Sequence, residues 1–242
     1  MSNTATNTDS KRILLIGGGS GIGHAIAAAA LERGDQPIIG ARDPEHTSST
    51  LPEALRGVPV VHADLADEDT IAALRESGPF DAVVSLAAAS ANGPVAELER
   101  AAIHSAFDAK VAGPMLLAKH LSGSIRPGGT FVFFSGVAAW KPAPGMSVMA
   151  TVNGAVAFMA EALAVELAPV RAVAVSPGII DSGLWDFMGD DGKRDFFRAT
   201  AAANPVRRVG TPADIVGAVL LAIDNTFITG TTLHVDGGGR LT

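Results

Sequence analysis

The sequence predicts an α/β fold: a doubly wound parallel sheet of seven strands with helices on both faces. Short apolar or β-branched runs alternate with longer segments of helical periodicity along the chain, as in parallel strands joined by helical crossovers. The chain has 242 residues, of which 48% are hydrophobic and 18% charged, so it is long enough for one well-buried domain and short for two. No repeat, linker or break in composition divides it. We therefore expect one domain, 11–242, after a flexible polar tail, 1–10.

Apolar clusters and boundary residues locate the elements of this sheet. Strands are expected at 12–16, 37–40, 58–62, 81–87, 128–136, 171–176 and 231–236. Helices are expected at 21–34, 67–77, 95–121, 146–168 and 212–223. Gly34 ends the first helix, acidic residues occupy the first turn of the second, and Pro169 follows the fourth. The segment 179–205 combines glycines, charges and aromatic residues, and we expect it to form a lid over the sheet.

Charge and cysteine content exclude several kinds of function. The formal net charge is −7, which argues against a nucleic-acid partner because no basic excess neutralises phosphates. The chain has no cysteine, so disulfides, thiolate catalysis and cysteine-ligated metals are excluded; the histidines lack ligand spacing, and we expect no metal. The first residues have no apolar signal-peptide core, and no apolar run approaches the roughly 18 residues that span a bilayer. We expect a cytoplasmic protein without membrane contact.

A glycine-rich turn follows the first strand. In RILLIGGGSGIGHAIA, Gly17, Gly21 and Gly23 lie between a strand and a helix. Glycine lets the backbone turn tightly and approach a pyrophosphate, and the helix N-terminus supplies N–H groups and partial positive charge. A glycine cluster alone also fits a simple tight turn, but its place in the first strand–turn–helix unit favours a dinucleotide site. No lysine follows Gly23, so the turn is not of the Walker type.

The spacing of these glycines resembles that of the short-chain dehydrogenase/reductase (SDR) family, which has a Rossmann fold and oxidises or reduces small molecules with NAD(P). The resemblance runs from Arg12 to Gly238 and includes a C-terminal signature at 208–212 and 229–238. The chain departs from the family at Ile16, where a threonine is usual. The resemblance implies cofactor contacts at Gly17, Gly19, Ser20, Gly21, Ile22, Gly23, Asp64, Leu65, Ser85, Ala87, Asn153, Pro177, Gly178, Ile180 and Ser182.

The end of the second strand favours NADP(H) over NAD(H). An NAD site needs a carboxylate there for the ribose hydroxyls, and the corresponding position is Ala41. Arg42 follows, and its guanidinium can pair with a 2′-phosphate in a fork. The alternative is a solvated loop charge paired with Asp43 or Glu45.

The catalytic tetrad that the resemblance implies is missing. The tyrosine position is occupied by Met149 and the lysine position by Asn153; the chain contains no tyrosine at all. The serine position is Gly136, next to Ser135, and the asparagine position is Lys110. A methionine cannot act as acid or base, although it can form an apolar wall beside a cofactor.

Lys110 and Asn153 exchange the residue types that the family places at these positions. Since the resemblance implies that both face one pocket, the exchange would keep one ammonium and one amide there. A desolvated lysine can act as acid, base or Schiff-base amine; the alternative is a surface lysine. Ser135 either donates a hydrogen bond to a substrate oxygen or bonds to the backbone. His104 and Asp108 either face the site or form an exposed pair on one helix. Lys110, Ser135 and Asn153 are our candidate catalytic residues.

Three functions remain open from the sequence. The first is an NADP(H)-dependent oxidoreductase for an apolar carbonyl, imine or enone, with non-standard acid/base residues. The second is a binding or regulatory protein that holds NADP(H) without turnover, and the third is non-redox dehydration, aldol cleavage or cyclisation. We favour the first because the glycine turn and the nicotinamide-side segment both persist; Met149, Leu184 and Trp185 would form an apolar substrate pocket. The helices at 95–121 and 146–168 are apolar on more than one face, which predicts a homo-oligomer, a dimer or a tetramer.

Overall fold

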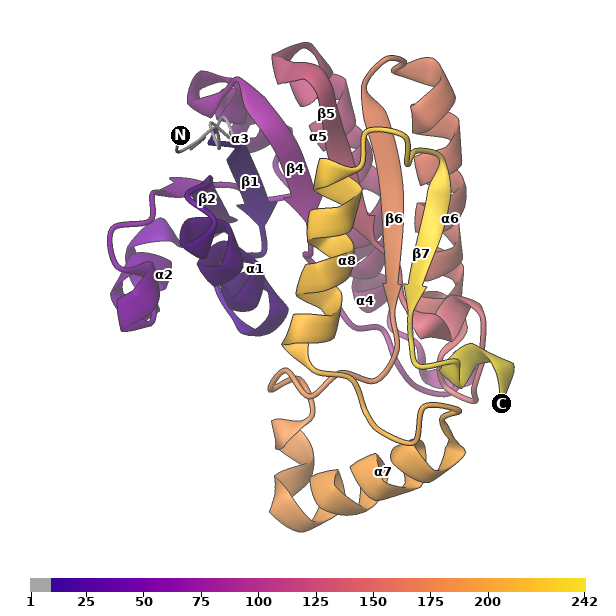
Figure 1. Cartoon of the computed structure of the whole chain (residues 1–242). Coiled ribbons are helices and arrows are strands. Elements are labelled where there is room, and N and C mark those ends of the chain that lie inside the picture. Colours follow the sequence, from indigo (N-terminus) through magenta and orange to yellow (C-terminus); the bar gives the residue numbers. More distant parts are fainter. Residues whose placement is uncertain (1–9) are drawn as a thin grey trace.

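A seven-stranded parallel sheet forms the centre of the protein, as the sequence predicts (Figure 1). The computed structural model describes residues 10–242, so the expected tail falls almost entirely outside the described residues. The strands are β1 (Arg12–Ile16), β2 (Gln36–Ala41), β3 (Val60–His62), β4 (Phe80–Ser85), β5 (Ile125–Phe134), β6 (Arg171–Pro177) and β7 (Thr231–Val235). Their order is β3-β2-β1-β4-β5-β6-β7. The direction of winding therefore reverses between β1 and β4, where doubly wound sheets bind ligands.

Helices cover both faces of this sheet (Figure 1). They are α1 (Gly21–Glu32), α2 (Pro44–Thr50), α3 (Glu68–Ala73), α4 (Arg100–Phe107), α5 (Gly113–Leu121), α6 (Ser147–Glu166), α7 (Gly189–Ala203) and α8 (Pro212–Asp224). One apolar cluster joins α1 and α8 to alternate residues of the strands, and a second joins α3, α5 and α6 to the other face. Strands buried on both sides need apolar residues at nearly every position, which is why the strands stand out in the sequence.

The expected helix 95–121 is wrong as a single helix. A π-helical turn, Asp108–Ala112, separates α4 from α5, and the N–H of Gly113 bonds to the carbonyl of Asp108, five residues earlier. Pro114 explains the interruption, because proline has no N–H to donate to the carbonyl of Lys110 four residues before it. The short helix α2, which we did not predict, begins where the Asp43 side chain accepts a hydrogen bond from the N–H of His46.

The segment expected as a lid contains a helix of its own. A short 3-10 turn, Asp186–Met188, leads into α7, none of whose residues is buried. The helix α7 projects from the body below the carboxyl ends of the strands (Figure 1). Trp185 holds the start of this segment: its Nε1 donates to the carbonyl of Ile180 at 3.1 Å, and its ring packs on Phe196.

The helix α6 is apolar enough and long enough to cross a membrane by composition alone, with a mean hydropathy of 1.7. The expectation that no apolar run approaches this length is therefore wrong for α6. Val156, Ala160 and Leu163 of this helix are buried in the cluster against the sheet. Core packing thus accounts for much of its apolar character.

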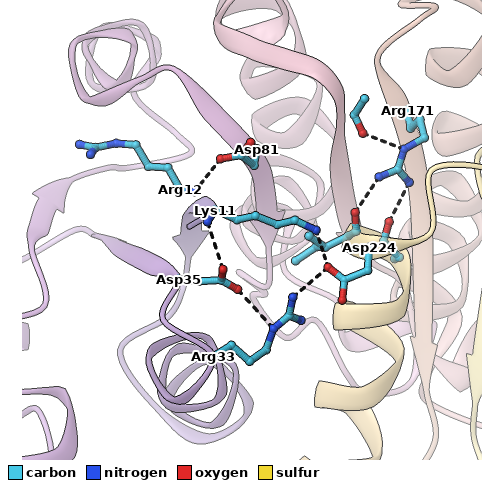
Figure 2. Close-up of polar contacts among 10 residues, drawn as sticks. Lys11, Arg12, Arg33, Asp35, Asp81, Arg171 and Asp224 are labelled. Carbon is cyan, nitrogen blue, oxygen red and sulfur yellow. Dashed lines mark hydrogen bonds and ion pairs between the residues drawn. The ribbon is translucent and has the colours of Figure 1, made fainter. Parts of the chain in front are cut away.

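Polar contacts tie α8 to the end of the sheet opposite the carboxyl ends of the strands (Figure 2). Arg171, only 4% exposed, donates to the carbonyls of Ala222 and Ile223 at 2.7 and 3.0 Å, and also to those of Gly128 and Ile228. The guanidinium thus caps the C-terminus of α8, where the helix carries partial negative charge. Asp224 ends α8 and accepts from both Lys11 and Arg33, so the same corner joins α1, β1 and β6.

Candidate functional site

A cavity of about 1270 Å³ lies at the carboxyl ends of β1, β2, β3 and β4. It brings together most of the residues predicted to bind the cofactor: Gly17, Gly19, Ser20, Gly21, Ile22, Gly23, Arg42, Asp64, Leu65, Ala87 and Ser182. These residues come from four strand ends and the start of the lid. The cavity is therefore large enough for a small-molecule ligand, and it lies where doubly wound sheets bind nucleotides.

The glycine turn forms the floor of the cavity. Its backbone is packed so closely that a side chain would not fit at Gly23. A Cβ on Gly23 would lie 2.6 Å from the Cα of Gly18, and Gly17 has a φ of +82°. Ser20 precedes α1, and its side chain does not cap the helix, which leaves the first amides of α1 without a side-chain acceptor. Such amides at a helix N-terminus suit a pyrophosphate, so the turn fits a dinucleotide.

Arg42 is the one lysine or arginine among the residues that line the cavity, and the end of β2 beside it carries no carboxylate. Arg42 follows β2, is exposed, and makes no ion pair with any residue in the range 10–242. Asp43, the suggested partner, instead caps α2 through the N–H of His46 at 2.9 Å. Ala41 lines the cavity where a carboxylate would face the ribose of NAD. The Asp64 carboxylate, across this end, accepts from the N–H of Ala66.

Sequence reasoning missed most of one cavity wall. Along α4 and the π-helical turn, the lining residues are Ala101, His104, Ser105, Asp108 and Ala109. They recur three or four positions apart, so a helical projection of this segment would have grouped them on one face. The structure places His104 and Asp108 on the cavity wall; His104 contacts Arg100 at 3.4 Å rather than Asp108.

Lys110 lies behind the cavity wall. Its side chain is 6% exposed, and its Nζ donates to the carbonyls of Phe134 at 2.9 Å and Ser135 at 3.4 Å. Burial lowers the pKa of its ammonium to about 8, because a low-dielectric environment disfavours the charged form. Asp108 and Ala109 before it and Phe134 opposite it line the cavity, whereas Lys110 does not.

Ser135 and Asn153 meet at the same strand end. The Oγ of Ser135 donates to the backbone carbonyl of Asn153 at 2.7 Å. The Oδ1 of Asn153 is buried and has no hydrogen-bond partner among residues 10–242. A Cβ on Gly136 would lie 3.1 Å from the Nδ2 of Asn153, so glycine leaves the space that the amide uses. The three candidate catalytic residues thus gather around the end of β5, and their catalytic roles remain predictions.

Several other predicted residues do not line the cavity. Pro177 ends β6, and Gly178 and Ile180 follow it. Asn153 is also not among the lining residues, and Ser85 is buried at the end of β4 with its Oγ unpartnered within residues 10–242. Leu184 does reach the cavity, whereas Trp185 holds the lid instead.

Comparisons with known proteins agree with this geometry. A family model described as enoyl-(acyl carrier protein) reductase matches residues 17–240. The chain belongs to the short-chain dehydrogenase/reductase family. The 3-oxoacyl-(acyl-carrier-protein) reductase MabA of Mycobacterium tuberculosis is 29% identical over 253 residues, covering 97% of this chain and 98% of the relative. The family is one of oxidoreductases, so the enzyme class implied by the resemblance is confirmed.

Solved SDR structures superpose along nearly the whole chain. A small-chain dehydrogenase in complex with NADPH has a TM-score of 0.81 and 31% identity, covering 97% of this chain and 100% of that one. MalC reductase/Diels-Alderase from Malbranchea aurantiaca has a TM-score of 0.86 and 28% identity, covering 96% and 97%. The doubly wound fold is therefore confirmed.

This SDR encloses Met149 in an apolar cluster. Met149 is 9% exposed and packs with Ala91, Ala106, Val148 and Val152. Its thioether has no proton to give, and its neighbours in this cluster are apolar. Met149 is not among the residues that line the cavity, and its place in a substrate pocket stays a prediction.

Proposed function

We propose that this SDR is an NADP(H)-dependent oxidoreductase that acts on an apolar small-molecule carbonyl, imine or enone with non-standard acid/base residues. The observation that carries the proposal is a cavity that keeps the glycine turn and has, next to the position of the missing ribose carboxylate, a guanidinium that makes no ion pair within residues 10–242. A similar structure is described as a complex with NADPH, which supports the choice of cofactor.

The chain offers a group for each part of NADP(H). The amides of the glycine turn and of the first turn of α1 would hold the pyrophosphate, and Arg42 would pair with the 2′-phosphate. Asp64 and Leu65 would contact the adenine, and the segment 177–182 would bind the nicotinamide amide. The nicotinamide supplies hydride chemistry when bound.

The polar groups at the end of β5 differ in whether they still have a free hydrogen-bonding atom for a substrate. Lys110 and Ser135 donate to main-chain carbonyls. The Oδ1 of Asn153 has no hydrogen-bond partner within residues 10–242, so it is free to accept a hydrogen bond from an N–H or O–H group of a substrate. We therefore propose that Asn153 orients the substrate while Lys110 and Ser135 support the wall, and that water supplies the proton. Without a protein acid the rate falls by roughly 10²–10⁴ for a plain ketone, which favours activated substrates.

The cofactor assignment is tested by binding measurements with Arg42 variants. Arg42→Ala should weaken NADPH binding by roughly ten- to a hundredfold, the loss of a charge-assisted pair, and leave NADH binding unchanged. Adding Ala41→Asp should reverse the preference, because the new carboxylate would face the ribose hydroxyls. Equal affinities of the native protein for NADPH and NADH, measured by calorimetry, would refute the assignment.

Turnover is tested separately from binding. The protein should oxidise NADPH with at least one apolar enone, cyclic imine or ketone of a panel, and Gly23→Ala should abolish that rate. Tight NADPH binding without oxidation across the panel would favour the second candidate, an NADP(H)-binding or regulatory protein.

A non-redox reaction is the other candidate. The absence of a protein acid at Met149 favours it, and the similar MalC is described as both a reductase and a Diels-Alderase. Dehydration, aldol cleavage or cyclisation would convert substrate without consuming NADPH. Mass spectrometry of reactions with and without NADPH would separate these outcomes.

We also propose a cytoplasmic homo-oligomer, a dimer or a tetramer. Phe158 and Val165 on α6 are 71% and 81% exposed, and Met115 on α5 is 43% exposed. Burying them against a second copy would remove a large apolar surface from water. Phe158→Asp should shift the protein to monomer in light scattering, whereas a native monomer would contradict the proposal.

A further inference from the structure

Two walls of the cofactor cavity come from different parts of the chain. Asp108 and Ala109, in the π-helical turn, line one wall, and Phe134, the last residue of β5, lines another. Lys110 connects the two from behind. It belongs to the π-helical turn, and its ammonium lies 2.9 Å from the carbonyl oxygen of Phe134 and 3.4 Å from that of Ser135.

The physical setting of this lysine is that of a structural tie. Its side chain is 6% exposed, and it makes no ion pair with a carboxylate of residues 10–242. A buried ammonium without a counter-ion is costly unless its protons are hydrogen-bonded. Two strand-end carbonyls meet that need here, and the charge makes both bonds stronger than neutral ones. The lysine therefore holds these two carbonyls in a defined place.

A second contact limits the movement of the same strand end. Ser135 donates to the backbone carbonyl of Asn153 in α6 at 2.7 Å, and its own N–H donates to the carbonyl of Val175 in β6 at 2.8 Å. The end of β5 is thus held by β6, by α6 and by the π-helical turn. Of these ties, only Lys110 reaches the wall that carries Asp108 and Ala109.

We propose that Lys110 is a positioning residue, whose ammonium sets the spacing between the π-helical turn and the end of β5 and so shapes the cavity for the nicotinamide cofactor. Only the expected effect on cofactor binding rests on the proposed function. The tie itself exists in the protein without any ligand. It assigns Lys110 a role that does not require proton transfer to a substrate.

Three variants separate this role from others. Lys110→Met removes the donors and keeps an unbranched side chain of similar length. Lys110→Gln keeps a neutral donor on a side chain one atom shorter. Lys119→Met is a matched control on an exposed lysine nine positions along. Hydrogen exchange of the Ser135 amide, measured without cofactor, reports the strand end directly. We expect Lys110→Met to speed this exchange about tenfold or more and to weaken NADPH binding about tenfold, the worth of one lost buried hydrogen bond. Lys110→Gln should stay within about threefold of the native protein, and Lys119→Met should match it.

The outcomes are distinguishable from failure of the proposed function. Native exchange rates in Lys110→Met, or loss of protection in Lys110→Gln equal to that in Lys110→Met, would overturn the inference. If Lys110→Met does not fold, Lys110→Gln decides alone: retained protection supports the tie and lost protection overturns it. If the native protein binds no NADPH, the proposed function fails, whereas the exchange data still decide the tie. A lysine acting as proton donor would instead lose kcat equally in both variants with NADPH affinity preserved in Lys110→Gln.

Discussion

Replacing Lys110 by methionine should change how the stability of the protein depends on alkaline pH. In the folded protein, burial lowers the pKa of this ammonium from 10.5 to about 8, whereas in the unfolded chain the lysine titrates at its ordinary value. Between these two values the unfolded chain holds a proton that the folded protein has released. Stability must therefore rise as pH increases through this window. Below pH 8 both states carry the charge, and the burial cost is present in full.

The size of the effect follows from the two pKa values. A shift from 10.5 to about 8 corresponds to about 3 kcal/mol at roughly 1.4 kcal/mol for each pH unit. The native protein should gain this amount over Lys110→Met between pH 7 and pH 10.5. At pH 7 the variant should be nearly as stable as the native protein or more so, since it avoids desolvating a charge but leaves two carbonyls without a donor.

Urea unfolding at half-unit steps from pH 7 to pH 10.5, followed by circular dichroism, measures this difference. The chain contains no tyrosine and no cysteine, so no phenol or thiol titrates alongside Lys110 in this window. Lys193 has a raised pKa from its bonds to Asp181 and Asp186, and its stabilisation is lost as pH rises. Because it is common to both proteins, it cancels in the difference. Lys119→Met is the control and should run parallel to the native protein. Parallel curves for Lys110→Met would refute the reasoning.

Three further changes test other parts of the structure. Arg171→Met leaves four carbonyls without their shared donor and should lower the free energy of unfolding by about 3–5 kcal/mol. Arg171→Lys should lower it by less. A decrease below about 1 kcal/mol in urea titrations would contradict the capping role. Gly23→Ala places a Cβ 2.6 Å from loop backbone and should weaken NADPH binding at least tenfold by calorimetry, with the far-ultraviolet spectrum of the native protein retained. Combining Met149→Tyr and Asn153→Lys with Gly136→Ser should raise ketone reduction by roughly 10²–10⁴-fold; an unchanged rate would contradict the view that the missing acid limits the reaction.

The fold was predictable because its signals are local. Runs such as RILLI and RAVAVS are apolar after their first arginine, apart from Ser176, since both faces of these strands are covered. Gly34 and Pro169 mark helix ends through backbone chemistry alone. The π-helical turn was not predicted, although Pro114, the residue that causes it, is visible in the sequence. Helical periodicity continues across it, and the one-residue shift in hydrogen bonding leaves little trace in the pattern of apolar residues.

The candidate site was predictable only where backbone chemistry requires a residue type. Gly23 has no space for a side chain, so the glycine spacing alone located the floor of the cavity. Ala101 and Ser105 on the α4 wall have no distinctive chemistry, and their place in the cavity depends on how α4 packs beside the sheet. The sequence left open whether Asp43 pairs with Arg42. Only the structure shows that Asp43 caps α2 instead.

By itself, the sequence determined the α/β class, the glycine turn at the first strand and the absence of any tyrosine, since these follow from residue identity and short-range spacing. Only the tertiary structure decided where the remaining polar groups point. Lys110 and Phe134 are 24 positions apart and become hydrogen-bonded partners at 2.9 Å because the π-helical turn and the end of β5 lie together at the carboxyl ends of the strands. Whether a lysine faces a cavity or a strand-end carbonyl depends on that meeting, because a long flexible side chain can satisfy its charge in either direction.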